Sequence, residues 1–184
     1  IMLRDQAAKF EVEGGTGGII RTCVIDGCLE IYKIDKTFRA VSPDGLDPEK
    51  TNPNMPWVIS EHSDVGSSHP IVARLLLQSE EILNSTLFER ELKHDRVLSI
   101  LHDAKEQVLN CENIFVDLAN KMVSIEEPIK ERGVRMDDAR RSLNPFPKLT
   151  CLDDLCSRYL YSAKRTIQNY ARMIDLFYET NIQG

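Results

Sequence analysis

The feature that most constrains the fold is a long apolar series in the middle of the chain. Its members recur at alternating steps of three and four residues, the spacing of one side of an α-helix. They are His94, Val97, Leu101, Ala104, Val108, Cys111, Phe115, Leu118 and Met122. No charged residue and no helix breaker interrupts the series. It predicts one unbroken helix whose apolar edge docks against other helices.

The expected ends of this helix follow from its flanking residues. Thr86 followed by Glu89 forms a capping box, in which each side chain bonds a free amide of the first turn. Pro128, directly after Glu127, is expected to close the helix because proline has no amide hydrogen to donate. A helix of about 35 residues would be about 50 Å long.

Two further helices are expected. One begins at Pro70, where a missing amide costs nothing, and ends near Asn84. The other begins at a Thr150–Asp153 cap and spans about 30 residues, or about 45 Å. Its apolar series is Leu152, Cys156, Tyr159, Ala163, Ile167, Tyr170, Ile174 and Phe177. Both long helices exceed the roughly 40 Å diameter of a compact globule of this length, so either one helix is kinked or the molecule is elongated. An elongated bundle would leave apolar flanks that a second copy could cover, and we therefore expect a homodimer.

The N-terminal part of the chain favours β-structure. β-Branched and aromatic residues flank Asp26-Gly27, a pair that tolerates the positive φ of a two-residue hairpin turn. Residues 9–13 are a candidate third strand, and the glycine-rich residues 14–18 are expected to form a loop. The chain is therefore predicted to have a mainly helical α+β fold. A β-hairpin or small meander occupies residues 1–41, a Pro-rich connector 42–69, and an antiparallel bundle of three or four helices, two of them long, 70–184.

Charge and cysteine content narrow the function classes. A net charge of −6 disfavours nucleic-acid binding through the whole surface. No apolar run is long enough for a transmembrane helix, and the N-terminus does not resemble a secretory signal. Five cysteines, an odd number, favour free thiols in a reducing compartment, so a cytoplasmic location is expected. Cys151 and Cys156 would lie about 140° apart on a helix, which argues against a shared zinc ion.

Residues 89–103 contain patterns typical of several enzyme classes. Glu91-x-x-His94 has the spacing of di-iron bundles, but that site requires a second copy of the motif, which the chain lacks. His94-Asp95 and His102-Asp103 are His-Asp doublets, as found in metal-dependent phosphohydrolases, and would need ligands from histidines in residues 62–69. An ordinary solvated helix face explains the same residues without any site. We therefore expect no metal and no cofactor.

Arg96 and His102 form a third pattern, Arg-x5-His. It resembles the Arg-x4–6-His motif of the HEPN ribonuclease superfamily, whose members are small, helical and commonly dimeric. The resemblance implies that Arg96 steadies a phosphate and that His102 handles a proton of the ribose 2′-hydroxyl. It covers two residues and the helical shape. Val97 departs from the family pattern, which usually has a polar residue after the arginine.

The sequence favours a non-enzymatic helical-bundle protein. Its expected role is oligomerisation or protein–protein interaction through the helical faces and the exposed hairpin edge. The partner would be a second copy, in a homodimer, or another protein. The alternative is a HEPN-like ribonuclease acting at a dimer cleft, with Arg96 and His102 as its catalytic candidates. A third hypothesis is metal-assisted hydrolysis by histidines within residues 62–102.

Overall fold

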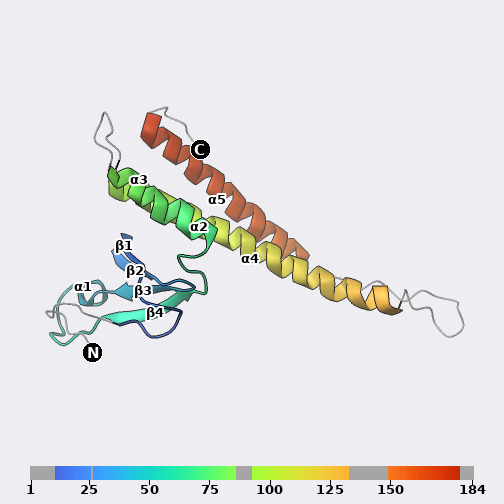
Figure 1. Cartoon of the computed structure of the whole chain (residues 1–184), viewed down its shortest axis with the longest axis horizontal. Helices are drawn as coiled ribbons and strands as arrows, with labels where there is room; N and C mark the ends of the chain where they lie inside the picture. The colour runs from blue at the N-terminus through green and yellow to red at the C-terminus, as the bar shows by residue number, and fades with distance from the viewer. Residues whose placement is uncertain (1–10, 26, 86–92, 133–148, 179–184) are drawn as a thin grey trace, which may run out of the picture.

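The computed structural model describes residues 11–25, 27–85, 93–132 and 149–178, which form a small sheet followed by helices (Figure 1). The strands are β1 (Arg21–Ile25), β2 (Cys28–Tyr32), β3 (Thr37–Val41) and β4 (Val58–Ser63). The helical elements are α1 (Pro43–Leu46), α2 (Pro70–Val72), the π-helical η1 (Ala73–Gln78), α3 (Ser79–Ser85), α4 (His94–Arg132) and α5 (Leu152–Tyr178). The predicted α+β order, an N-terminal antiparallel sheet followed by two long helices, is confirmed.

The sheet is an antiparallel meander in which each strand pairs with the next. Ile25 pairs with Cys28 across the predicted turn, where Gly27 has a φ of +77°. β4 lies inside residues 42–69, and none of its side chains is fully buried, which explains why the sequence there reads as a connector. Residues 11–13 of the expected extra strand form no strand, and residues 9 and 10 lie outside the described part.

Both faces of the sheet are covered. One face packs against the helices through an apolar cluster of Cys23, Ile25, Tyr32, Val72, Leu76 and Leu109. The opposite face packs against the N-terminal segment and the connector, through Val12, Ile31, Phe38, Ala40 and the partly buried Trp57. Side chains alternate between these faces along each strand. Residues at even positions of β2 therefore point toward the helices.

The three helical segments that precede α4 form one continuous stretch. It begins at Pro70, as the sequence predicts, and His69 caps it by accepting a hydrogen bond at Nδ1 from the amide of Ile71 (3.4 Å). η1 adds a π-helical segment to this stretch. The capping box of Thr86 and Glu89 lies outside the described residues.

Helix α4 passes through Pro128 and continues to Arg132, so the expectation that this proline closes the helix is wrong. Pro128 removes one amide donor, but it does so in an exposed part of the helix, so the carbonyl group left without a helical partner is accessible to solvent. An ion pair between Lys130 and Glu126 spans the proline at 2.9 Å. α4 is therefore about 58 Å long and α5 about 40 Å long at 1.5 Å per residue.

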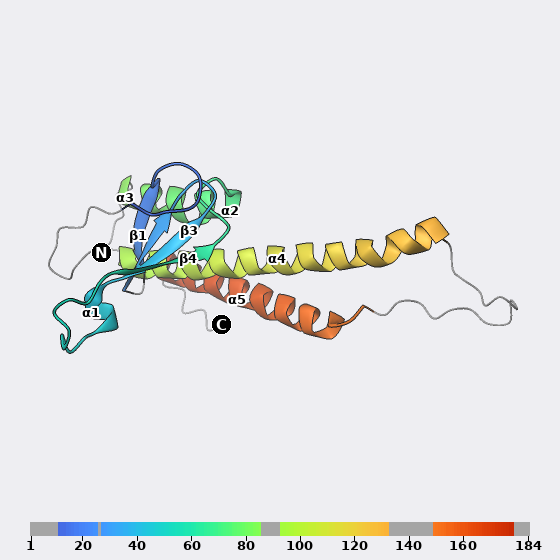
Figure 2. The same ribbon diagram turned by 90° about the horizontal axis from the view of Figure 1, so that it is seen from below.

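Helix α4 lies between the other layers of the molecule (Figure 2). The sheet and the stretch α2–α3 cover one side of its N-terminal half, and α5 runs antiparallel along another side. Three helices converge at one end of the molecule, where the buried Leu83, Val97 and Leu101 meet partly buried residues of α5. Further along, α4 and α5 form a two-helix pair that projects beyond the sheet. The predicted bundle of three or four helices is not confirmed.

None of the described helices combines the length and the apolar character needed to cross a bilayer.

Candidate functional site

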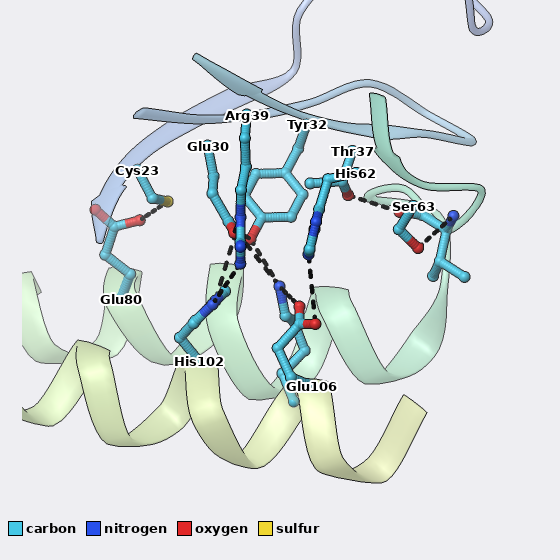
Figure 3. Close-up of polar contacts among 12 residues, drawn as sticks. Cys23, Glu30, Tyr32, Thr37, Arg39, His62, Ser63, Glu80, His102 and Glu106 are labelled. Carbon is cyan, nitrogen blue, oxygen red and sulfur yellow. Dashed lines mark hydrogen bonds and ion pairs between the residues drawn. The ribbon is translucent and has the colours of Figure 1, made fainter. Parts of the chain in front are cut away.

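Polar side chains gather between the sheet and α4, where an apolar core would be expected (Figure 3). Glu30 and Tyr32 are two residues apart on β2, so their side chains lie on the same face of the sheet. Arg39 on β3 pairs with Glu30. Successive turns of α4 contribute residues from below, and β4 contributes a histidine. We call this group the polar cluster: Glu30, Tyr32, Arg39, His62, His102, Lys105 and Glu106.

The ammonium group of Lys105 lies at the centre of the polar cluster. Its Nζ is 3.0 Å from the Tyr32 hydroxyl, 3.5 Å from Glu30 Oε2 and 2.9 Å from Glu106 Oε1. Arg39 Nε donates to Glu30 Oε1 at 2.7 Å, and the Tyr32 hydroxyl donates to Glu30 Oε2. Two carboxylates are therefore matched by two cations.

Burial makes these ion pairs sensitive to any change of charge. Lys105 and Glu30 are each 1% exposed. Burial by itself raises the pKa of Glu30, but the charge of Lys105 and the hydrogen bond from Tyr32 outweigh it, so the pKa lies below its ordinary value. Burial likewise raises the pKa of Glu106, but the charge and hydrogen bond of Lys105 together with the two nearby histidines outweigh it, so this pKa is also lowered. Both carboxylates are therefore ionised at neutral pH.

His102 is a neutral member of the polar cluster. Its Nε2 lies 3.3 Å from Arg39 Nη2, and since a guanidinium only donates, Nε2 must accept and the proton must sit on Nδ1. Nδ1 lies 3.5 Å from Glu30 Oε2 without hydrogen-bond geometry, and it has no hydrogen-bond partner among the described residues. Burial, followed by the charge of Lys105, lowers the pKa of His102.

Glu30, His102 and Glu106 bring potential metal-ligating atoms within 4.8 Å of one another. The charges oppose a metal at this place. The ammonium of Lys105 already lies between the two carboxylates, and a divalent ion would add two charges beside it and beside Arg39. The Nδ1 atom that faces Glu30 carries a proton and offers no lone pair. The polar cluster is best explained as a charge-balanced contact that joins the sheet to α4.

The two residues of the ribonuclease pattern lie in different environments. Arg96 is exposed, whereas His102 is 4% exposed and packed beneath the sheet. Because Arg96 and His102 are six positions apart on one helix, their side chains point about 120° apart around its axis. In this structure an RNA strand would meet Arg96 but not the imidazole of His102. The HEPN-like activity stays a prediction from the sequence.

The other histidines are divided among several contacts. His62 Nε2 lies 3.4 Å from Glu106 Oε2, inside the polar cluster. His69 lies farther along α4, where its Nε2 is 3.3 Å from Glu112 Oε2. His94 begins α4, and its motif partner Glu91 lies outside the described residues. The structure therefore places His62 beside Glu106 and His102 beside Glu30, but the ammonium of Lys105 already lies between these two carboxylates.

A second candidate site is an apolar surface on α5. The side of α5 that packs against α4 is marked by buried residues at seven-residue intervals, Leu155, Ser162 and Asn169. Asn110 Nδ2 on α4 donates to Ser162 Oγ at 2.7 Å across this contact. The apolar series that the sequence assigns to helix packing lies elsewhere on α5. Most of its members are exposed, so the prediction that it packs within the chain is wrong; its last member, Phe177, does pack against α3 and α4.

This mostly exposed series, with Tyr178 in place of the packed Phe177, forms what we call the outer stripe. It consists of Leu152, Cys156, Tyr159, Ala163, Ile167, Tyr170, Ile174 and Tyr178. Members recur every eleven residues, close to three full turns, so the stripe keeps to nearly one side of the helix. Ile167 is 70% exposed and Tyr170 71% exposed. Large apolar side chains are thus presented to solvent along the length of α5.

Helix α4 extends this apolar surface. Its predicted apolar edge is buried at Val97 and Leu101, as expected, but Phe115 and Met122 are exposed because the sheet does not reach them. A hollow of about 270 Å³ lies between the helices and joins Phe115 to the outer stripe at Tyr159. Its lining is Ile114, Phe115, Leu118, Leu155, Cys156, Tyr159 and Leu160.

No family model, curated protein or solved structure matches this chain. The sites must therefore be judged from their own geometry.

Sequence reasoning missed the polar cluster apart from two of its histidines, His62 and His102, which it named only as isolated candidates. Glu30 and Tyr32 could have indicated it, because two polar side chains two positions apart within an apolar strand lie on one face of the sheet and make that face polar. Lys105 gives no signal, because a lysine beside an apolar helix edge normally lies in solvent. The outer stripe was recognised as apolar, but its location on the exposed side of α5 could not be read from its spacing.

Replacing Lys105 tests whether the polar cluster holds the sheet on α4. We expect Lys105→Met to lower the free energy of unfolding by about 3–5 kcal/mol, because it removes a buried cation from the buried carboxylate of Glu30 and from the partly exposed carboxylate of Glu106. The exposed pair of Lys121 and Asp117 supplies the control, and Lys121→Met should change stability by less than about 0.5 kcal/mol. Urea titration measures both values. Equal losses in the two variants would contradict the role assigned to Lys105.

The lowered pKa of His102 makes stability depend on pH. The unfolded chain has the ordinary value of 6.5 and therefore takes up this proton first as pH falls. The stability contributed by neutral His102 is present above pH 6.5 and is lost progressively below it. We expect the urea midpoint to fall between pH 7 and pH 5, and to fall less steeply in His102→Gln, whose amide oxygen still accepts from Arg39. Identical slopes in both proteins would refute this assignment.

Proposed function

We propose that this protein is a non-enzymatic oligomerisation module that associates through the outer stripe of α5 and the adjoining face of α4. The single observation that carries the proposal is the position of the outer stripe. The most regular apolar series of α5 points to solvent, while a face containing Ser162 and Asn169 makes the contact within the chain. Exposed apolar surface of this extent marks an interaction site rather than an ordinary monomer surface.

The size of the surface supports a stable interface. The outer stripe with Leu160, Phe115 and Met122 exposes roughly 1,000 Å², taking about 200 Å² for a fully exposed large apolar side chain. The largest apolar patch of a typical monomer covers about 300–600 Å². A standard protein–protein interface buries about 800 Å² on each partner. The available surface therefore exceeds what a monomer normally leaves bare and suffices for an interface.

The shape of the surface favours a helix as its occupant. The stripe is long and narrow and follows one helix, so a second helix lying alongside could contact every turn. Tyr159, Tyr170 and Tyr178 supply large side chains of the type that dominates interface energetics. The polar cluster supports no comparable role, because its charged groups are already matched with one another and two of them, Glu30 and Lys105, are buried.

A matched pair of tyrosine variants tests the proposal. Tyr170, in the outer stripe, is 71% exposed, and Tyr161, on the opposite side of α5, is 64% exposed. We expect the 184-residue chain to sediment at twice its own mass of 21.0 kDa at micromolar concentration. Tyr170→Lys should weaken association at least about tenfold, the effect of losing an aromatic anchor, whereas Tyr161→Lys should leave it unchanged.

Two results would count against this function. A mass equal to one chain across the concentration range would exclude self-association. Equal weakening by both variants would place the interface somewhere other than the outer stripe. Helical circular dichroism of each variant shows whether a loss of association reflects the surface or a loss of folding.

A further inference from the structure

We infer that the partner of the outer stripe is the same stripe of a second copy, with the two α5 helices antiparallel and a two-fold axis near Ala163. The inference rests on the proposed function and adds the identity and the direction of the partner helix. It follows from the order of residues along the stripe, from their sizes and from the position of the sheet.

The spacing of the outer stripe reads the same in both directions from Ala163. From Leu152 to Ile174 the steps are four, three, four, four, three and four residues. In a two-fold interface, if residue i of the first copy contacts residue j of the second, then residue j of the first copy contacts residue i of the second. Centring the axis on Ala163 satisfies this condition, because Leu152 then lies opposite Ile174, Cys156 opposite Tyr170, and Tyr159 opposite Ile167.

The sizes of the paired side chains favour this antiparallel arrangement. Ala163, the smallest member, lies at the axis, where the two backbones approach most closely. The small Cys156 faces the large Tyr170. A parallel arrangement would instead set each residue against its own copy. Tyr159 and Tyr170 would then each lie against the same tyrosine of the other copy and be overpacked. Cys156 and Ala163 would each lie against a small side chain and leave a gap, and both overpacking and gaps are destabilising.

The position of the sheet is compatible with the same arrangement. The sheet packs on the side of α4 away from α5, so it does not lie over the outer stripe (Figure 2). It also lies toward one end of the long helices. Antiparallel α5 helices would place the two sheets at opposite ends of the dimer. The antiparallel helix dipoles would be mutually favourable as well.

Cysteine cross-linking of the full-length chain distinguishes the arrangements. Cys28, Cys111 and Cys151 are replaced by serine, while native Cys156 is kept. Cys23 is also kept, because it is buried, and burial together with Glu80 raises its pKa to about 12. Ala163→Cys is then oxidised at micromolar concentration, and the linked peptides are identified by mass spectrometry. Tyr161→Cys in the same background is the control on the opposite side of α5.

We expect Ala163→Cys to give disulfide-linked dimers through residue 163 in more than half of the chains. The control should give none. Cys156 should not link to its own copy, because fourteen residues of helix separate the two by about 21 Å in the antiparallel dimer.

Each other outcome overturns the inference in a recognisable way. Linkage between two Cys156 residues would show a parallel dimer, and the proposed function would stand. A dimeric mass without linkage at residue 163 would likewise reject the axis but retain self-association. A mass of one chain before oxidation would defeat both the inference and the proposed function.

Discussion

The arrangement of the molecule depends on which side of α5 contacts α4. The contact uses Leu155, Ser162 and Asn169, which recur every seven residues. This side of α5 is poorer in apolar surface than the outer stripe. It even leaves Asn169 Nδ2 buried without a hydrogen-bond partner among the described residues, at a cost of about 1–3 kcal/mol. A helix that packed only within its own chain would be expected to bury its most apolar side. The use of the less apolar side for the contact with α4 is explained if the outer stripe binds another helix.

The sheet and the projecting helices are stabilised by different means. The polar cluster joins the sheet to the N-terminal half of α4 through ion pairs centred on Lys105 and Glu30. Removing one member of such a buried group costs more than the group as a whole contributes, so the cluster fixes position more than it adds stability. The C-terminal half of α4 has no such contact with the sheet. This division separates the sheet layer from the helical surface that we propose as the site of association.

The sequence was sufficient to predict elements with strong local signals. The apolar series through Val97 and Leu101 specified a helix, and Gly27 specified a hairpin turn. The sequence was not sufficient for contacts whose signal is not apolar. Ser162 and Asn169 do not resemble packing residues, so the contact face of α5 could not be found. The pairing of Glu30 with Lys105 joins residues 75 positions apart, and neither residue specifies the other without the fold. His102 was noticed for its neighbours in sequence, whereas its environment is set by the sheet.

The reactivity of Cys156 tests the central claim most directly, because this thiol lies in the outer stripe. Cys28, on the sheet, serves as the internal comparison. The wild-type chain is alkylated briefly at several protein concentrations, and each cysteine is quantified by peptide mass spectrometry. The account predicts that Cys156 reacts readily in dilute protein and becomes protected as concentration rises, while Cys28 does not change. Protection of Cys156 at every concentration would mean that the stripe packs within the chain, and no protection at any concentration would mean that nothing covers it.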